Sequence, residues 1–431
     1  MSTGSDNTEL KRELGVFQAM MLGLGSILGT GVFVSIGLGA DVAGASVVLA
    51  VVLAAGLATC NGLSSAQLAA NHPVSGGTYE YGYRWLSPRL GFTAGWMFMC
   101  AKSASAATAA LSVSAYVLQQ FSLSDMLVLP AALIIILIVT CLTLSGIKRS
   151  SRVNTIIVSI TIISLLCFIG AAFKVTNIVG SSHFDELFTS VSEDAFSFFE
   201  CVALMFVAYT GYGRIATLGE EVKDPGRNIP RAIITTLVVS MLLYVLVALS
   251  AVGMVGASHY GSLAVNDFAP LQRIASKFGS PVLAGVISIG AVTAMLGVLL
   301  NLILGLSRVL LAMGRRSDVP TRLGHVIEGT GVPVPATICV GVIIAAIVLV
   351  GDIKTTWSFS AYTVLIYYAL TNLCAIRLDN ELRLYPVWIS YCGLAGCVFL
   401  TLWIDWPVWL AGVSLLITGL IWRAIALKLK A

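Results

Sequence analysis

The chain has 431 residues, of which 58% are hydrophobic and only 11% are charged, whereas about 25% of the residues of a soluble globular domain are charged. This composition indicates a bilayer as the main solvent and excludes an appended catalytic domain, a nucleic-acid module and a disordered regulatory tail. The formal net charge is +4, and in a membrane protein its distribution matters more than its sum.

Apolar runs bounded by charge, glycine or proline follow one another along the whole chain. They lie near 15–40, 43–69, 90–119, 126–146, 153–173, 195–222, 231–256, 281–312, 332–350, 355–376, 386–404 and 407–426. About 20 apolar residues cross the hydrocarbon core of a bilayer as a helix. The sequence therefore predicts an all-α integral membrane protein with twelve transmembrane helices, in which no apolar segment resembles a cleaved signal peptide.

The basic residues sort to one side of such a membrane protein. Eighteen of the 25 lysines and arginines fall in the connections that share a side with the N-terminus: Lys11, Arg12, Arg84, Arg89, Lys148, Arg149, Arg152, Lys223, Arg227, Arg231, Arg315, Arg316, Arg322, Arg377, Arg383, Arg423, Lys428 and Lys430. The opposite connections hold Lys174, Arg273, Lys277 and Lys354. Because positively charged loops stay in the cytoplasm, we expect a multi-pass protein of the inner (cytoplasmic) membrane with both termini cytoplasmic.

Two of the predicted spans contain clusters of glycine at mid-membrane depth. The first span includes GSILGTG at residues 25–31, and the sixth includes AYTGYG at residues 208–213. Glycine weakens a helix, and irregular backbone at that depth is tolerated only where it lines a cavity. We therefore expect helices 1 and 6 to be discontinuous, although close helix packing also explains many glycines in membrane helices.

Interrupted helices five spans apart are typical of a five-plus-five inverted repeat. The repeats would cover about 15–173 and 195–376 of a single transmembrane transporter domain, 1–431, with extra helices at about 386–426. Free N–H groups at the ends of half-helices suit a carboxylate, and freed carbonyl groups suit an ammonium. A zwitterionic amino acid matches both.

Four motifs in order resemble the amino acid permeases of the amino acid-polyamine-organocation superfamily. They are GSILGTGVF at 25–33, HPVSGGTYEYGYRWLSPRLGF at 72–92, FVAYTGYGRIATLGEEVKDPGRNIP at 206–230 and SRVLLAMGRRSDVP at 307–320. The resemblance extends along most of the chain. It implies the leucine-transporter-type fold and alternating access around a central site between spans one, three, six and eight.

The resemblance also implies the residues of that site. Substrate carboxylate would be bound at Ser26, Ile27, Gly29, Thr30 and Gly31, mostly through backbone N–H groups. The ammonium and the side chain of the substrate would be held by the segment of span six that comprises Phe206, Val207, Ala208, Tyr209, Thr210 and Gly211.

The chain departs from the family that it resembles at several positions where members carry a charge. Proton-coupled and cationic-substrate members place a glutamate at the position of Ala101, a lysine at that of Thr161 and an aspartate at that of Gly213. The loss of the two acids favours a neutral substrate. Lys102 lies in mid-span, where a lysine costs about 2.5 kcal/mol or more unless it pairs, extends to the surface or reaches water. We hypothesise that Lys102 supplies the charge that Thr161 lacks, and we assign both positions to ion coupling.

Opposite charges also face one side of the predicted membrane. Glu220, Glu221 and Asp224 follow span six, while Arg84, Arg89 and Arg308 lie in or beside connections on the same side. Such charges can form an inward gate that opens with the cavity, or they can simply be solvated, since exposed pairs contribute little.

These observations predict a secondary active transporter of neutral L-amino acids that works by alternating access, as a proton symporter or an exchanger. Its partners would be a small amino acid, protons and membrane lipids, with no nucleic acid, cofactor or metal. We do not expect an enzyme, because the sequence places no nucleophile-base pair at membrane depth. Two alternatives stay open. One is a carrier of polyamines, other amines or cationic amino acids on the same fold; the shortage of carboxylates at membrane depth stands against it, because only Glu200 could pair with a cation there. The other is an amino acid sensor that does not transport.

Overall fold

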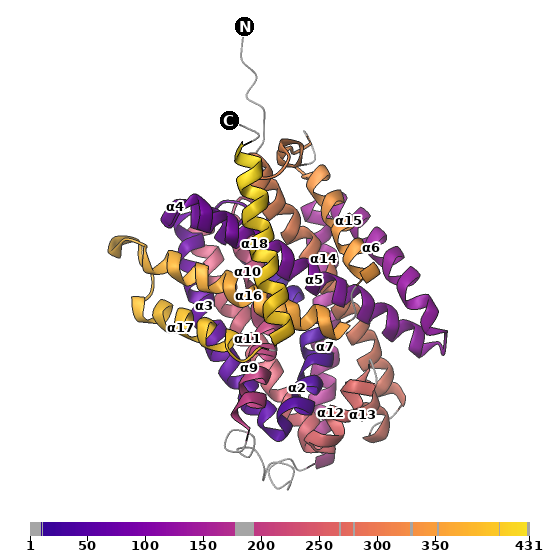
Figure 1. The fold of residues 1–431 in the computed structure, drawn as a ribbon. Helices are drawn as coiled ribbons and strands as arrows, with labels where there is room; N and C mark the ends of the chain where they lie inside the picture. The colour runs from indigo at the N-terminus through magenta and orange to yellow at the C-terminus, as the bar shows by residue number, and fades with distance from the viewer. Residues whose placement is uncertain are drawn as a thin grey trace.

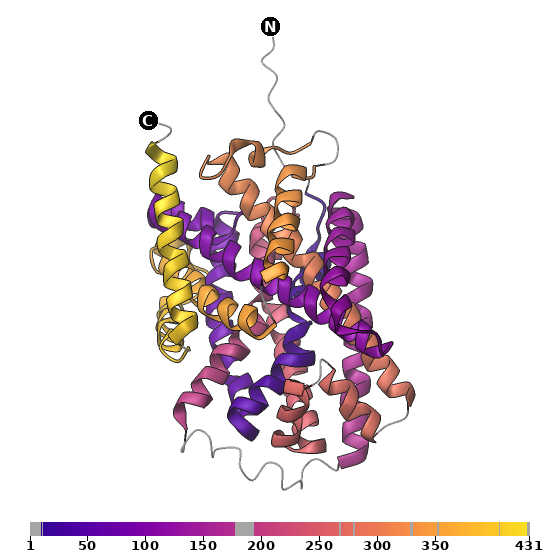
Figure 2. The ribbon, with the colours of Figure 1, turned by 45° about the vertical axis from the view of Figure 1, so that its right-hand side comes forward.

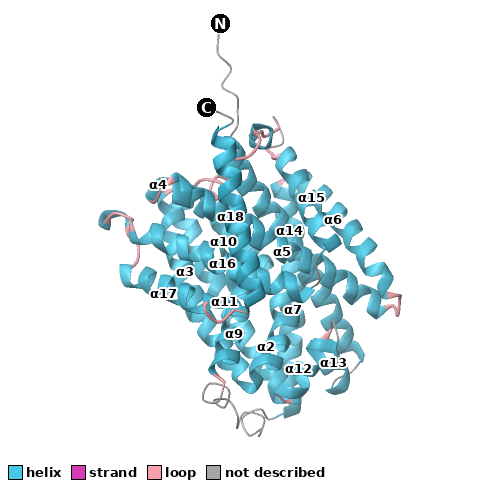
Figure 3. Ribbon diagram, in the orientation of Figure 1, coloured by secondary structure: helices cyan, strands magenta, loops and turns pink. Residues whose placement is uncertain are grey.

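The computed structural model describes residues 10, 12–176, 194–266, 269–278, 281–327, 331–350, 353–404 and 406–428. Over these residues the chain is helical, with isolated β-bridges and no strand (Figure 3). The prediction of an all-α fold is therefore confirmed for the described chain. Of the basic residues that set the expected orientation, Lys11 and Lys430 lie outside the described residues, and so do the side chains of Lys354 and Lys428.

The helices follow the apolar runs of the sequence. The first part of the chain forms α1 (Val16–Ile27), α2 (Ile36–Ala43), α3 (Val47–Asn71), α4 (Thr78–Trp85), α5 (Pro88–Gln120), α6 (Val128–Leu144) and α7 (Ile147–Thr176). The second part forms α9 (Ala195–Tyr209), α10 (Gly213–Thr217), α11 (Pro225–Val255), α12 (Ala257–Asn266), α13 (Pro270–Phe278), α14 (Pro281–Arg315), α15 (Val334–Val350), α16 (Ile353–Ile376), α17 (Val387–Thr401) and α18 (Trp406–Lys428). Helices α4, α12 and α13 fall in segments that the hydropathy pattern places in connections.

Eight helical stretches of the described chain are long and apolar enough to cross a membrane. They are Val16–Asn71, Asp125–Leu144, Ile147–Lys174, Ala195–Thr217, Pro225–Val255, Pro281–Arg315, Phe359–Ile376 and Trp406–Ala426. Large apolar side chains also point away from the bundle, among them Leu137 and Ile138 of α6 and Ile163 of α7. An exposed apolar surface of this kind suits lipid rather than water, so the chain is a multi-pass membrane protein.

Helix α5 forms the centre of the bundle, where it packs against α14 and α16 (Figure 1). Most of its 33 residues are buried, which explains why serine, threonine and alanine, rather than larger apolar residues, dominate its sequence. Helix α1 packs against α7, α11 and α14, and α3 packs against α9 and α11. The first described residues and the C-terminal end of α18 lie at one end of the bundle, and α12 and α13 lie at the other (Figures 1 and 2).

Both glycine-rich spans leave regular α-helical geometry, as the sequence predicts. Helix α1 ends at Ile27, Leu28 has ψ 89°, and a π-helical turn, η1 (Gly31–Ser35), leads into α2. In the sixth span α9 ends at Tyr209, and a 3₁₀ turn, η6 (Thr210–Tyr212), leads into α10. The second interruption is milder than the first because all three residues of η6 stay helical and only the hydrogen-bond pattern changes.

Candidate functional site

The two interrupted spans face each other closely. A Cβ atom added to Gly211 would lie 2.6 Å from the carbonyl oxygen of Ser26, and one added to Gly31 would lie 2.8 Å from the Cβ of Ala208. Any larger side chain at these positions would force the spans apart, since real Cβ contacts are never that short. Glycine therefore serves close approach here, as the packing interpretation of the sequence predicts.

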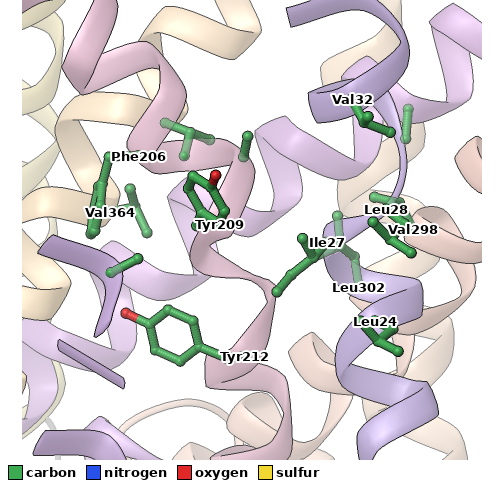
Figure 4. Packing of buried hydrophobic residues seen from close by; sticks show 14 of the residues in the cluster. Leu24, Ile27, Leu28, Val32, Phe206, Tyr209, Tyr212, Val298, Leu302 and Val364 are labelled. Carbon is green, nitrogen blue, oxygen red and sulfur yellow. The ribbon is translucent and has the colours of Figure 1, made fainter. Parts of the chain in front are cut away.

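A small cavity lies between the interruptions and helices α5 and α14. Its walls are Ser26, Ile27, Thr30, Gly31, Lys102, Ser105, Val207, Ala208, Thr210, Val298 and Leu302. Its volume is about 20 Å³, enough for about one water molecule. An amino acid would need side chains such as Ile27, Val298 and Leu302, which cluster on one side of the sixth span in Figure 4, to move apart.

Most of the residues predicted for the site line this cavity, but five do not. Gly29 packs against Val298 of α14, and the backbone of Gly211 packs against Ser26. Phe206 meets the ring of Tyr368 edge-on, with centroids 5.7 Å apart, and Tyr209 meets that of Tyr244 at 4.9 Å.

Thr161, the fifth, is not among the cavity walls. Its hydroxyl donates to the carbonyl oxygen of Ile157 within α7 at 3.0 Å. The assignment of Thr161 to ion coupling stays a prediction, and so does the binding role of each cavity residue.

Lys102 is the charged group of this cavity. The residue is 5% exposed. Its ammonium group donates to Thr210 Oγ1 at 2.6 Å, and Thr210 Oγ1 donates to the carbonyl oxygen of Val207 at 2.7 Å. The alternative that Lys102 extends to the membrane surface is therefore wrong. Lysine has three donors, and this contact uses one of them.

Two tyrosines that sequence reasoning missed hold the interruptions in place. The Tyr244 hydroxyl lies 2.6 Å from the carbonyl oxygen of Ile27, to which it donates, and 3.3 Å from that of Ala208. The Tyr368 hydroxyl donates to the carbonyl oxygen of Thr210 at 2.9 Å. Carbonyl groups freed by a helix break need such donors in a low-dielectric interior. No sequence signal distinguishes these tyrosines from others in apolar helices.

A larger cavity, of about 600 Å³, lies among α5, α14, α15 and α18. Its walls are almost entirely apolar and include Trp96, Leu310, Ile343 and Trp422. A zwitterion needs polar partners for both charged groups, so the smaller cavity between the interruptions is the better candidate.

Ion pairs close the end of the bundle at which α14 ends, which we call the ion-pair end. Arg308 binds both carboxylate oxygens of Glu221, at 2.7 and 3.2 Å, and both side chains are 1% exposed. Arg315 pairs with Glu220 at 2.8 Å. Opposite charges thus pair at this end, as the sequence predicts. Among the described residues, the guanidinium of Arg84 instead lies over Trp85 and beside His72.

A second cluster at the ion-pair end joins α4 to the residues after α14. Arg316 binds both oxygens of Glu80, at 2.8 and 2.5 Å, and these hydrogen bonds raise the pKa of Arg316. The hydroxyls of Tyr79 and Tyr83 donate to Asp318 Oδ2 at 2.7 and 2.5 Å. Burial, together with Asp318, raises the pKa of Tyr83 to about 12, so this hydroxyl stays a donor.

Comparison with known proteins identifies the family. The model of the amino acid permease family matches residues 18–429. The chain belongs to this family. An uncharacterized transporter of Mycobacterium tuberculosis is 37% identical over 413 residues, which cover 95% of this chain and 90% of the relative. The branched-chain amino acid permease BcaP of Bacillus subtilis is 33% identical over 352 residues, which cover 77% of this chain and 73% of the permease.

A more distant relative in the amino acid permease family is a vacuolar cationic amino acid transporter of Arabidopsis thaliana. It is 26% identical over 393 residues, which cover 86% of this chain and 64% of the relative. The names of the relatives indicate a transporter and not an enzyme. The family resemblance carried by the four sequence motifs is confirmed.

Proposed function

We propose that the protein is a secondary active transporter that moves neutral L-amino acids across the cytoplasmic membrane by alternating access, as a proton symporter or an exchanger. The observation that carries the proposal is Lys102, whose ammonium group lies in a cavity between two interrupted spans. Besides Lys102, the described walls of that cavity contain hydroxyl and apolar groups but no carboxylate. A substrate with a net positive charge would meet repulsion there, whereas a zwitterion brings a carboxylate that suits Lys102.

The proposal extends to the architecture. Twelve membrane-spanning segments would comprise two inverted repeats, at about 15–173 and 195–376, and an additional pair at about 386–426. Leu14, just before α1, forms a β-bridge with Val222, which follows α10, at the ion-pair end. Helix α1 therefore begins at this end, and α10 ends there. The interrupted spans are thus antiparallel, which supports an inverted repeat. The concentration of arginine at this end supports a cytoplasmic location for it and for both termini.

The same cavity supports the proposed substrate class. Ile27, Val298 and Leu302 are among its apolar walls, which suit a small or medium aliphatic side chain. The name of the 33% identical relative, a branched-chain amino acid permease, supports a neutral substrate, while the cationic transporter is a more distant relative. A cationic substrate would need a carboxylate that the described cavity walls lack.

The test is uptake by purified protein in liposomes of each of the twenty amino acids and of common amines, with and without proton and sodium gradients. We expect a neutral amino acid to accumulate inside the vesicles with time. Binding without accumulation would identify a sensor, and preferred uptake of an amine would identify the alternative carrier.

The role of Lys102 is tested in the same vesicles. Because we propose that Lys102 carries the coupling charge, Lys102→Met is expected to abolish the gain from an imposed pH gradient. Lys148→Met, which removes an exposed lysine that pairs with Glu13 at 3.3 Å, is the matched control and should behave as wild type. Unchanged gradient-driven accumulation in Lys102→Met would refute the coupling role.

A further inference from the structure

Arg214 of α10 is a buried arginine whose donors are mostly unused. The residue is 3% exposed, and its Nη1 donates to Thr217 Oγ1 at 3.0 Å. Its Nε and Nη2 atoms are buried and have no hydrogen-bond partner among the residues that the structure describes. Leaving charged donors unpaired in the interior of a membrane protein is costly, and such groups usually mark substrate or ion pathways.

The position of Arg214 is between the cavity and the ion-pair end. Thr210 lines the cavity and precedes Arg214 by four residues, about one helical turn. On the opposite wall Leu302 lines the cavity, and Gly305 follows it by three residues in α14. A Cβ atom on Gly305 would lie 3.0 Å from both Cδ and Nη1 of Arg214. The guanidinium group therefore lies about one turn beyond the cavity, in space that Gly305 leaves open.

The nearby carboxylate of Glu221 does not neutralise the charge of Arg214, because it is already paired. Glu221 gives both of its oxygens to Arg308, one turn further along α14. These two arginines and one glutamate leave an excess positive charge in the buried part of the path.

The free atoms of Arg214 have a specific geometry. Nε and Nη2 form one edge of the planar guanidinium, and this edge binds the two oxygens of a carboxylate through parallel hydrogen bonds. A carboxylate is also the group that every amino acid substrate carries.

We propose that Arg214 is a second, transient binding site for the carboxylate of the substrate, one turn from the central cavity toward the ion-pair end. When the Arg308–Glu221 pair opens, the carboxylate passes from the cavity to the free edge of Arg214 before it leaves. The proposal rests on the transport function proposed above. It goes beyond that function because it gives the two sides of the protein different determinants of affinity.

The test compares Arg214→Gln and Arg214→Lys with wild type in right-side-out and inside-out membrane vesicles. The probe is the radiolabelled amino acid that wild type accumulates best among the twenty. Loss of a charge-assisted bidentate contact should raise the half-saturation concentration at the ion-pair side about tenfold or more, and leave that at the opposite side within about twofold. Lysine keeps the charge but cannot form the bidentate contact, so we expect Arg214→Lys to raise the half-saturation concentration less, and on the same side. Arg231→Gln, which removes an exposed arginine, should change neither side.

Each outcome bears on the proposal. Equal changes on both sides, or none, in a wild-type background that transports would overturn the carboxylate site and leave the transport function intact. Failure of wild type to move any amino acid would overturn both. If Arg214→Gln does not elute as a folded protein in size-exclusion chromatography, Arg214→Lys decides, because half-saturation constants equal to those of wild type on both sides overturn the site.

Discussion

The buried ion pair between Arg308 and Glu221 allows a quantitative prediction that tests the proposed inward gate. Both side chains are 1% exposed, and two hydrogen bonds join them. Removing one partner of such a pair leaves an unpaired buried charge and costs about 3–5 kcal/mol. Because glutamine keeps one acceptor oxygen, we expect Glu221→Gln to weaken the closed state by the lower figure, about 3 kcal/mol, which is about a 10²-fold shift toward opening.

Hydrogen exchange measured by mass spectrometry reports this opening directly. Glu221 lies in a segment that the N-terminal residues hold: the Leu14 amide donates to the Glu221 carbonyl oxygen at 2.9 Å, and the Lys223 amide donates to that of Leu14 at 2.8 Å. The amides of Leu14 and Lys223 exchange when the segment that carries Glu221 separates from the N-terminal residues. In Glu221→Gln they should exchange about 10²-fold faster than in wild type, while amides within α11 stay protected.

The neighbouring glutamate provides a matched control. Glu220 pairs with Arg315, and the two side chains are 20% and 27% exposed. A partly exposed pair contributes about 0–1 kcal/mol, so Glu220→Gln should accelerate exchange by no more than about fivefold. The double variant Glu221→Gln with Arg308→Met also removes the unpaired positive charge of Arg308, and it should return exchange toward the wild-type rate. Equal exchange in the two single variants would refute the reasoning.

Three further predictions concern the interruptions and the loop after α3. Gly211→Ala places a Cβ atom 2.6 Å from the Ser26 carbonyl oxygen, and the required backbone shift should reduce uptake into liposomes about tenfold or more. Tyr244→Phe leaves the carbonyl groups of Ile27 and Ala208 without this donor. It should cost about 1–3 kcal/mol, measured as a lower melting temperature. Burial, with the charges of two arginines, lowers the pKa of His72 to about 4. Because the unfolded chain takes up this proton near pH 6.5, the histidine makes stability fall as pH drops from 6.5 toward 4. His72→Gln should flatten that part of the curve of melting temperature against pH.

Each of these variants has a control in the same chain. Gly285→Ala adds a methyl group that has no atom of the described residues within 4 Å, and it should leave uptake unchanged. Tyr391→Phe alters a tyrosine that is 54% exposed, and it should leave the melting temperature unchanged. If Gly211→Ala transports as well as Gly285→Ala, the close approach of the two spans is not required. A melting curve of His72→Gln that parallels wild type below pH 6.5 would assign the acid sensitivity to other groups.

The sequence predicts the helices well where a long apolar run ends at a charge or a proline. The predicted run 281–312 corresponds to α14 (Pro281–Arg315), and the run 126–146 corresponds to α6 (Val128–Leu144). Helices α12 and α13 are missed because their segments are polar and short, and only packing against neighbours such as α2 and α14 stabilises them there.

The candidate site is predictable only in part, for a physical reason. The glycine clusters mark where the backbone of two spans is interrupted, and Lys102 is conspicuous because a lysine at that depth is costly. The partners of these groups come from distant parts of the chain. Tyr244 meets Ile27 across 217 residues, and Tyr368 meets Thr210 across 158. A hydroxyl in an apolar helix gives no indication of which carbonyl it will satisfy.

The order of groups between the cavity and the ion-pair end shows where sequence reasoning stops. Leu302, Gly305 and Arg308 follow one another at three-residue spacing, so any helical α14 places them along one side of the helix. In the structure these positions are an apolar wall of the cavity, a gap and a buried charge. The sequence does not indicate what fills the gap. That group is Arg214, from the turn after the interruption of the sixth span. Because α10 begins there and ends at the loop that carries Glu221, a rearrangement at the interruption would move both Arg214 and Glu221. Such a rearrangement would therefore couple the conformation of the cavity to the Arg308–Glu221 pair, which is the predicted inward gate.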